Sequence, residues 1–471
     1  MMKSLFAGVT GLKTHQSRMD VIGNNISNVN TVGYKGSSMR FQDLLYQTTQ
    51  SATGPSSTGR AGTNARQIGL GAQTASIVTN ISQAGSPETT GMALDMYLDG
   101  DSFFMVSPDG SQNLYYTRAG AFTVDAEGTL CMASNGYPVM GYGTTQVDDG
   151  TGTMITAIDG SKLQTLPIQN VSNSTCEPSA TTKAFMTGIV DQDDTDFDVN
   201  GKAVSFSFYD NVGYMYTANY YLTKTMTAAT PPTWDGTYTL TLNNIKDSKD
   251  NDVTDATGSP TTATSVILDF NTKGTLYEAS GTITAEAAKE ALLTSTTSPG
   301  GPLTFTFTSP VSGGTNTITV DYAELTNYAN NKRCAITSNP GTSSADSTGS
   351  GWATGSLRGF NVGTDGTIYG TYTNGQTKLL GQIPVATFSN AAGLSKEGDN
   401  LYASTLNSGT RTIGDPTAGG GKLVTGQLEM SNVDLAQEFT TMITTQRGFQ
   451  ANSRIITVSD TLLEELTNLK R

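Results

Sequence analysis

The chain has 471 residues, which is too long for one ordinary domain and predicts about three or four. Its formal net charge is -14 and charged residues make up only 14%, so it lacks the basic surface by which proteins bind nucleic acid or anionic membranes. The 52 glycines and the absence of long apolar runs indicate a turn-rich β protein, for which we expect neither a nucleic-acid partner nor membrane insertion.

The N-terminal segment predicts a helix over residues 4–29. Its apolar side chains recur every three or four positions, at Leu5, Val9, Leu12, Met19, Ile22, Ile26 and Val29. Gly8, Gly11 and Gly23 each cost a helix roughly 1 kcal/mol relative to alanine. The helix is therefore expected to need a partner. It has no apolar run of the kind found in a cleavable signal peptide.

Residues 31–70 are rich in Gly, Ser and Thr and predict an extended hinge or linker. The glycines expected to give this segment its freedom are Gly33, Gly54, Gly59 and Gly62.

The middle of the chain predicts strands separated by turns. Alternating runs bounded by Gly, Asn, Asp or Pro lie at 203–209, 214–222, 237–242, 265–270, 303–308 and 315–320. The composition changes near residues 142 and 351, which indicates an inserted segment. We expect an inner β domain of residues 71–145 with 355–425, and an outer β insertion, of one domain or two, at 146–354.

The C-terminal segment predicts a long helix from about residue 433. Its apolar residues follow heptad spacing and are Leu435, Phe439, Met442, Phe449, Ile456 and Leu463. Two arrangements remain open: an intramolecular helical hairpin, or a coiled coil that is completed by neighbouring copies. The predicted fold is multidomain and mainly β, with a terminal α-helical coiled-coil domain formed by residues 1–30 with 431–471.

One motif identifies a family. Residues 20–35 read DVIGNNISNVNTVGYK, which resembles the signature of flagellar rod and hook proteins, where a helix ends in an Asn-rich turn. Asn24, Asn25 and Asn28 carry amides that can bond backbone groups as the helix gives way to a loop.

Further segments resemble the same family. They are LDGDSFFMV at 98–106, YTRAGAFTVD at 116–125, NGYPVMG at 135–141, LEMSNVDL at 428–435 and TQRGFQANSR at 445–454. The chain departs from the family pattern at Ser102, Cys131 and Gly448, none of which has an expected chemical role.

The middle of the chain resembles hook rather than rod proteins. The matching runs are FYDNVG at 208–213, TVDYAELT at 319–326, YTNGQT at 372–377 and ATFSNAAGL at 386–394. The resemblance implies a structural subunit that polymerises into a flexible helical tube and acts as a universal joint carrying motor torque to the filament. A distal rod protein, a hook–filament junction protein and a secreted β-rich adhesin are the alternatives.

The resemblance also implies partners and a location. Besides copies of itself, these are the distal rod protein, the hook cap protein, the hook–filament junction protein and the flagellar type III export apparatus, by which the chain would reach the hook without a cleaved signal. Leu5, Val9, Leu12, Met19, Ile22, Asn24, Asn25, Ile26 and Asn28 of the first helix, with Leu435, Phe439, Met442, Phe449, Ile456 and Leu463 of the last, are the expected subunit-interface residues.

Catalysis and cofactors are not expected. The one histidine, His15, excludes a multi-histidine metal site, and the three cysteines, Cys131, Cys176 and Cys334, form no CxxC pair. Residues 196–201 fit the start of a calcium loop through Asp196, Asp198 and Asn200, but Ser207 stands at the twelfth position, where a glutamate is required. A solvated hairpin turn at Asn200-Gly201 is the favoured interpretation, and a calcium site is the alternative.

Overall fold

The computed structural model describes residues 2–468 apart from 56–58, 60, 111–112, 149–153, 199, 227–232, 254–264, 271–273, 281–302, 312, 342–348 and 419–420. The chain divides into two compact units. Unit 1 comprises Met1–Asn173, Gly359–Thr371 and Thr377–Arg471, and unit 2 comprises Ser174–Arg358 and Tyr372–Gln376. Each unit therefore contains segments that are far apart in the sequence.

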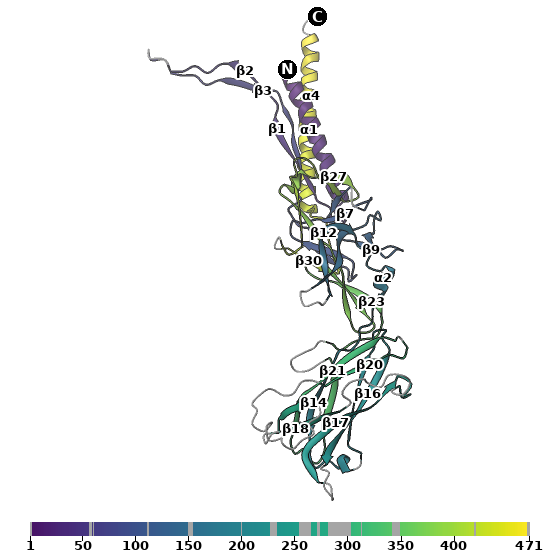
Figure 1. Ribbon diagram of the computed structural model, residues 1–471. Helices are drawn as coiled ribbons and strands as arrows, with labels where there is room; N and C mark the ends of the chain where they lie inside the picture. The colour runs from purple at the N-terminus through teal and green to yellow at the C-terminus, as the bar shows by residue number, and fades with distance from the viewer. Residues whose placement is uncertain are drawn as a thin grey trace. The chain divides into compact units, whose positions relative to one another are not determined.

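Two long helices stand at the ends of the chain, as predicted. Helix α1 spans Met2–Ser27 and helix α4 spans Leu435–Asn468, and both belong to unit 1 (Figure 1). Asp434 caps the start of α4, because its Oδ1 accepts the backbone N–H of Ala436 at 2.8 Å. The mainly β fold with helical ends is confirmed.

Residues 37–79 form a β hairpin, where the sequence predicted an extended linker over 31–70. Strand β1 (Ser37–Asp43) pairs with β4 (Ala72–Thr79), and β2 (Tyr46–Gln50) pairs with β3 (Arg66–Gly69) (Figure 1). Met39 is the one buried side chain in these four strands. Without a buried face the hairpin has no hydrophobic alternation, so sequence periodicity could not predict it.

The rest of unit 1 is a β domain built from both flanks of unit 2. It extends to Asn173 and resumes at Gly359. Its earlier strands are β5 (Pro87–Thr89), β6 (Met96–Asp99), β7 (Phe104–Val106), β8 (Tyr115–Thr117), β9 (Phe122–Val124), β10 (Leu130–Met132), β11 (Met140–Asp148) and β12 (Met154–Thr165), followed by the short helix α2 (Val171–Ser174). The later ones are β24 (Thr367–Tyr372), β25 (Thr377–Gln382), β26 (Val385–Phe388), β27 (Ser395–Gly398), β28 (Leu401–Ala403), β29 (Arg411–Gly414), β30 (Lys422–Thr425) and β31 (Gln427–Glu429), with the 3-10 turn η2 (Ala391–Gly393). The predicted inner domain of 71–145 with 355–425 therefore ended too early, because β12, within the predicted insertion of 146–354, pairs with β11 of this domain.

The two flanks are joined by strand pairing and by shared cores. Strand β28 pairs with β8, β30 with β6 and β31 with β5, all antiparallel. Two apolar clusters fill the domain, one around Phe104 and Leu130 and one around Phe103 and Tyr402. Neither flank can complete this domain alone, so its folding requires residues from both halves of the chain.

Unit 2 contains two sheets around one core. The first has the order β20-β21-β14-β22 and the second β15-β16-β17-β18-β19. Their bounds are β14 Lys183–Val190, β15 Lys202–Tyr209, β16 Met215–Met226, β17 Trp234–Asp247, β18 Ser265–Phe270, β19 Leu276–Ser280, β20 Leu303–Thr308, β21 Thr315–Asn327 and β22 Ala335–Pro340. Strands β13 (Thr175–Cys176) and β23 (Gly355–Val362) and the 3-10 turn η1 (Thr195–Asp198) complete the order of elements.

The core of unit 2 is rich in aromatic side chains. Phe208 of one sheet lies 6.0 Å, ring centre to ring centre, from Phe305 of the other and 5.3 Å from Phe307. Burial alternates along β15 and β16, as the period-two runs in the sequence predicted. All six strands predicted in this region are present.

Candidate assembly surface

Helices α1 and α4 lie antiparallel and in contact. Near one end the Ser4 hydroxyl is 3.5 Å from that of Ser459. Near the other end Asn25 Nδ2 donates to Glu438 Oε1 at 2.9 Å. The order of these pairs along the two helices fixes their opposite directions.

The helix contact depends on glycine. A Cβ at Gly11 would lie 2.7 Å from Asn452 Nδ2, and one at Gly448 would lie 2.7 Å from His15 Cε1, both closer than real Cβ contacts. At Gly23 nothing lies within 4 Å. Gly11 and Gly448 thus leave room for the side chains of Asn452 and His15 where the two helices touch, whereas Gly23 has no such role.

The structure divides the predicted interface residues into three groups. Ile22 and Asn25 are buried. Those half-buried are Leu5, Leu12, Met19, Ile26, Asn28, Met442, Ile456 and Leu463. Those exposed are Val9, Asn24, Leu435, Phe439 and Phe449. The buried residues of α4 are Thr445 and Ser459, and its contact with α1 also includes Ile456 beside Gly8 and Asn452 beside Gly11.

A second set of apolar side chains on the two helices is exposed in the single chain. We call it the outer helical surface: Phe6 and Val9 of α1, with Phe439, Ile443, Val458, Leu462 and Leu466 of α4. Ile443 and Val458 are each 58% exposed, although both are fully apolar. Sequence reasoning found only Val9 and Phe439 of this set, because it followed a single heptad seam. Exposed apolar surface of this extent marks an interaction site.

Asn25 joins the end of α1 to the start of the hairpin. Its Oδ1 accepts the backbone N–H of Ser37 at 2.9 Å and the hydroxyl of Tyr34 at 3.3 Å, while Nδ2 donates to the Ser37 carbonyl at 2.8 Å. Asn28 Nδ2 donates to Asn24 Oδ1 at 2.8 Å and to the carbonyl of the same residue at 2.9 Å. The Asn-rich motif therefore closes the helix, as its residue types predicted.

Three charged residues, Lys35, Arg118 and Glu429, form a buried cluster near the end of α1. Sequence reasoning assigned none of them to a site. Lys35 Nζ lies 2.8 Å from Glu429 Oε1, and Arg118 Nη1 lies 3.5 Å from Glu429 Oε2. None is more than 1% exposed. Each comes from a family-like run, at 20–35, 116–125 and 428–435, so those runs converge on one buried ionic cluster.

Backbone groups complete the ionic cluster. Lys35 Nζ also donates to the Gln83 carbonyl at 2.7 Å, and the backbone N–H of Gly85 donates to Glu429 Oε1 at 2.9 Å. Burial lowers the pKa of Lys35, and the neighbouring carboxylate of Glu429 opposes that effect. The cluster ties the end of α1 to the strand that precedes α4.

Models of four families of flagellar axial proteins match successive parts of the chain. "Flagella basal body rod protein" matches residues 5–35, "Flagellar hook protein FlgE/F/G D1 domain" 97–175, "Flagellar basal body protein FlaE D2 domain" 170–342 and "Flagellar basal body rod FlgEFG protein C-terminal" 424–469. The chain is 34% identical to the flagellar hook protein FlgE of Borreliella burgdorferi and 33% identical to that of Treponema pallidum, each over 100% of both chains. This chain belongs to the flagellar hook protein family.

Further similar proteins include another hook protein and a rod protein. The FlgE hook protein of Salmonella typhimurium is 30% identical over 99% of this chain and 100% of its own. The basal-body rod protein FlgG of Bacillus subtilis is 27% identical over 100% of both chains. A crystal structure of the Helicobacter pylori hook protein FlgE2 covers 73% of this chain and 100% of its own, at 16% identity and a TM-score of 0.45. As a member of the hook family, this chain is a structural subunit.

The predicted hinge glycines of this hook protein occupy different environments. Gly33 has a φ of 70°, and a Cβ there would lie 2.7 Å from the backbone nitrogen of Ala119, so it is packed rather than free. Gly54, Gly59 and Gly62 lie toward the hairpin tip, where Thr53 and Thr63 form an isolated bridge. A Cβ at Gly54 or Gly59 would meet nothing within 4 Å.

The candidate calcium loop of the hook protein is partly engaged by a lysine. Lys202 Nζ lies 2.7 Å from Asp196 Oδ2 and 3.7 Å from Asp194 Oδ2. The side chain of Asp198 lies outside the described residues. Within the part of the chain that the structure describes, no three His, Cys, Asp or Glu side chains gather as metal ligands.

The remaining candidate chemical groups are buried or packed. Cys131, Cys176 and Cys334 are buried free thiols, and burial raises the pKa of Cys334 to about 12. His15 packs edge-on against Phe41, with ring centres 5.5 Å apart. None of the helices that the structure describes is long and apolar enough to cross a membrane.

Proposed function

We propose that this hook subunit polymerises head to tail into a flexible helical tube that transmits motor torque to the filament as a universal joint. The observation that carries the proposal is the outer helical surface, which no part of the described chain covers. Because its large apolar side chains are exposed in the single chain, copies of the same helices are the natural cover. A contact between two different faces builds an open helix when its rotation does not close into a ring, and repeated around an axis such contacts form a tube.

In this proposal the chain has four working parts. Residues 1–30 with 431–471 form a coiled-coil inner tube completed by neighbouring copies, and the β domain of unit 1, which extends to residue 173 and resumes at residue 359, forms the shell around it. Unit 2, residues 174–358 with 372–376, forms the outermost part. The hairpin, which replaces the predicted linker, connects the first two parts.

Bending requires rigid domains joined by compliant segments. The ionic cluster supports a rigid joint beside Gly33. A Cβ at Gly62 would lie 2.8 Å from the Thr53 carbonyl oxygen, which leaves Gly54 and Gly59 near the hairpin tip as the compliant positions. Replacing Gly54 with alanine should stiffen isolated hooks if this is so. Unchanged bending would count against a hinge at the hairpin tip.

The proposed partners follow from membership of the hook family. They are the distal rod protein at the base of the hook, the hook cap protein during growth, the hook–filament junction protein at the end, and the flagellar type III export apparatus. The split β domain suits export in an unfolded form, since neither half can complete its core before the other arrives.

A distal rod subunit is the second candidate, favoured by the full-length similarity to the rod protein of Bacillus subtilis. Electron microscopy of polymers of the purified chain separates the two. Curved tubes that change curvature with conditions support the hook, and straight, stiff tubes support the rod. Failure to form any polymer would contradict both.

A further inference from the structure

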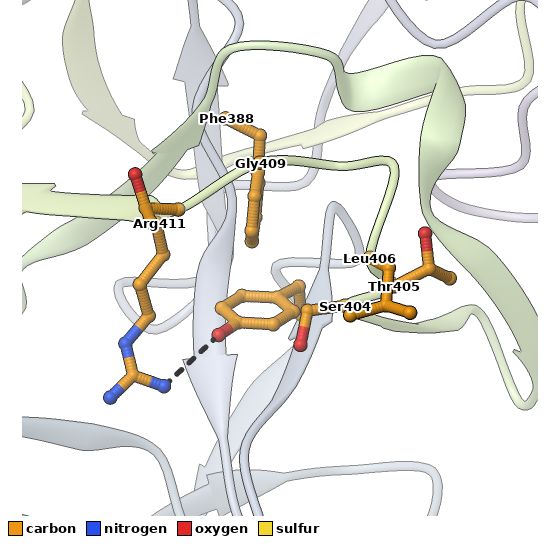
Figure 2. A pocket seen from close by; sticks show the side chains of 8 residues that line it. Phe388, Ser404, Thr405, Leu406, Gly409 and Arg411 are labelled. Carbon is orange, nitrogen blue, oxygen red and sulfur yellow. Dashed lines mark hydrogen bonds between the residues drawn. The ribbon is translucent and has the colours of Figure 1, made fainter.

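A hollow of 590 Å³ opens on the β domain of unit 1, beside strands β26 and β29 (Figure 2). Its walls include Tyr116, Phe388, Leu406 and Arg411. Figure 2 shows Phe388 with Arg411 to one side and Leu406 to the other, and the Tyr116 ring packs against Phe388. The hollow therefore combines an aromatic floor with an aliphatic rim and one positive charge.

The floor of this hollow is held in place. Tyr116 is only 1% exposed, and its ring packs edge-on against Phe388 with centres 4.7 Å apart. Arg411 Nη1 donates to the Tyr116 hydroxyl at 3.4 Å, and Phe388 pairs with Arg411 across β26 and β29. A site with fixed walls loses little freedom when it is filled, which favours binding.

Two features of the rim indicate that something else fills the hollow. Leu406 is fully exposed, although leucine gains most from burial. Arg411 forms no ion pair with any carboxylate of the described residues. The missing occupant should therefore offer apolar side chains beside an acidic group.

The hairpin carries a segment of that chemistry. Asp43 ends β1, Leu44 and Leu45 follow it, and Tyr46 begins β2; all four are exposed, with Leu45 at 65% and Tyr46 at 54%. Asp43 forms no ion pair with any cation of the described residues. We call residues 43–46 the hairpin knuckle.

The knuckle is also held in shape. The backbone N–H of Leu44 donates to the Gly71 carbonyl at 2.9 Å, and the N–H of Leu70 donates to the Leu45 carbonyl at the same distance. Its exposed side chains thus project from paired strands rather than from a free loop. An acidic, apolar knuckle matches a basic, aromatic hollow in both charge and polarity.

We propose that the hollow of one copy receives the hairpin knuckle of a second copy, with Asp43 facing Arg411 and the leucine and tyrosine of the knuckle covering the aromatic floor. The inference rests on the proposed self-polymerisation and names two further surfaces that take part in it. Because the hollow and the knuckle are different surfaces, the contact runs head to tail and can repeat along the tube.

Mixed cysteine variants test the contact directly. Tagged copies with Leu45→Cys are polymerised with untagged copies carrying Leu406→Cys and then oxidised, and the native cysteines do not interfere because all three are buried. We expect a disulfide-linked dimer of tagged and untagged chains in the polymer but not in the unpolymerised mixture. Val212→Cys, at an exposed position in unit 2, replaces Leu406→Cys as the control and should give no dimer.

A charge exchange tests the pairing of Asp43 with Arg411. Asp43→Arg and Arg411→Asp should each raise the critical concentration for polymerisation about tenfold, and the double variant should return it to within about twofold of the wild type. Normal polymer without the mixed dimer, or single variants that are impaired without rescue in the double, would overturn this inference alone. A wild-type chain that forms no polymer would overturn the proposed function and this inference with it.

Discussion

Lys35 and Glu429 form a buried ion pair of 2.8 Å across a separation of 394 residues. The pair joins the loop after helix α1 to strand β31, which precedes helix α4. The two ends of the chain are thus fixed to the same point of the β domain, and the antiparallel helices extend from that point.

Breaking this pair should destabilise unit 1 strongly. Glu429→Gln leaves Lys35 and Arg118 buried without their carboxylate, and removal of one partner of a buried pair costs about 3–5 kcal/mol. Chemical denaturation followed by circular dichroism measures the loss. The control is Lys246→Met, since Lys246 and Asp250 form an exposed pair, which should contribute less than about 1 kcal/mol.

Two glycines of α1 should respond in opposite ways to alanine. Gly11→Ala places a Cβ against Asn452 and should weaken the contact between the helices, so that helix content and polymer yield fall. Gly23→Ala meets nothing within 4 Å and should stabilise the helix by about 1 kcal/mol through propensity alone. Equal effects of both variants would show that the close contact at Gly11 is unimportant.

The outer helical surface should matter for assembly and not for folding. Ile443→Ser combined with Val458→Ser removes two apolar side chains that are exposed in the single chain, so its stability to denaturant should change by less than about 0.5 kcal/mol per site. The critical concentration for polymerisation should rise at least about tenfold, since burial of one such side chain is worth about 1.5–3 kcal/mol. Val212→Ser in unit 2 should leave assembly intact.

His15 should make the helix contact sensitive to acid. Burial, with a smaller contribution from Arg18, lowers the pKa of His15 below 6.5, so the unfolded chain binds this proton more readily than the folded one. The stabilising effect of the neutral ring is complete above pH of about 6.5 and declines as the pH falls below that value. In the variant His15→Gln, the denaturation midpoint should depend less on pH between about 5 and 7 than it does in the wild type. An unchanged pH dependence would contradict this role.

The sequence predicted the terminal helices well, because their apolar residues repeat every three or four positions. It could not divide the apolar residues between the contact inside the chain and a contact between copies. Phe439 is half exposed in the single chain, where Thr445 and Gly448 lie against α1, so its place at a subunit interface stays a prediction. Periodicity identifies an apolar stripe but does not say which partner covers it.

Two features could not be predicted from local pattern. The hairpin has almost no buried face, so its strands resemble a polar linker. The ionic cluster depends on residues brought together from three distant segments, and no spacing rule connects Lys35 to Arg118 or Glu429. The family-like motifs at those positions were a signal, but they did not reveal that their charged residues meet.

Electron microscopy of flagella from cells that lack this chain, and from the same cells supplied with it, tests the central claim most directly. The account predicts that hooks and filaments are lost while the rod remains, and that the wild-type chain restores both. A normal hook in the cells that lack the chain would contradict it.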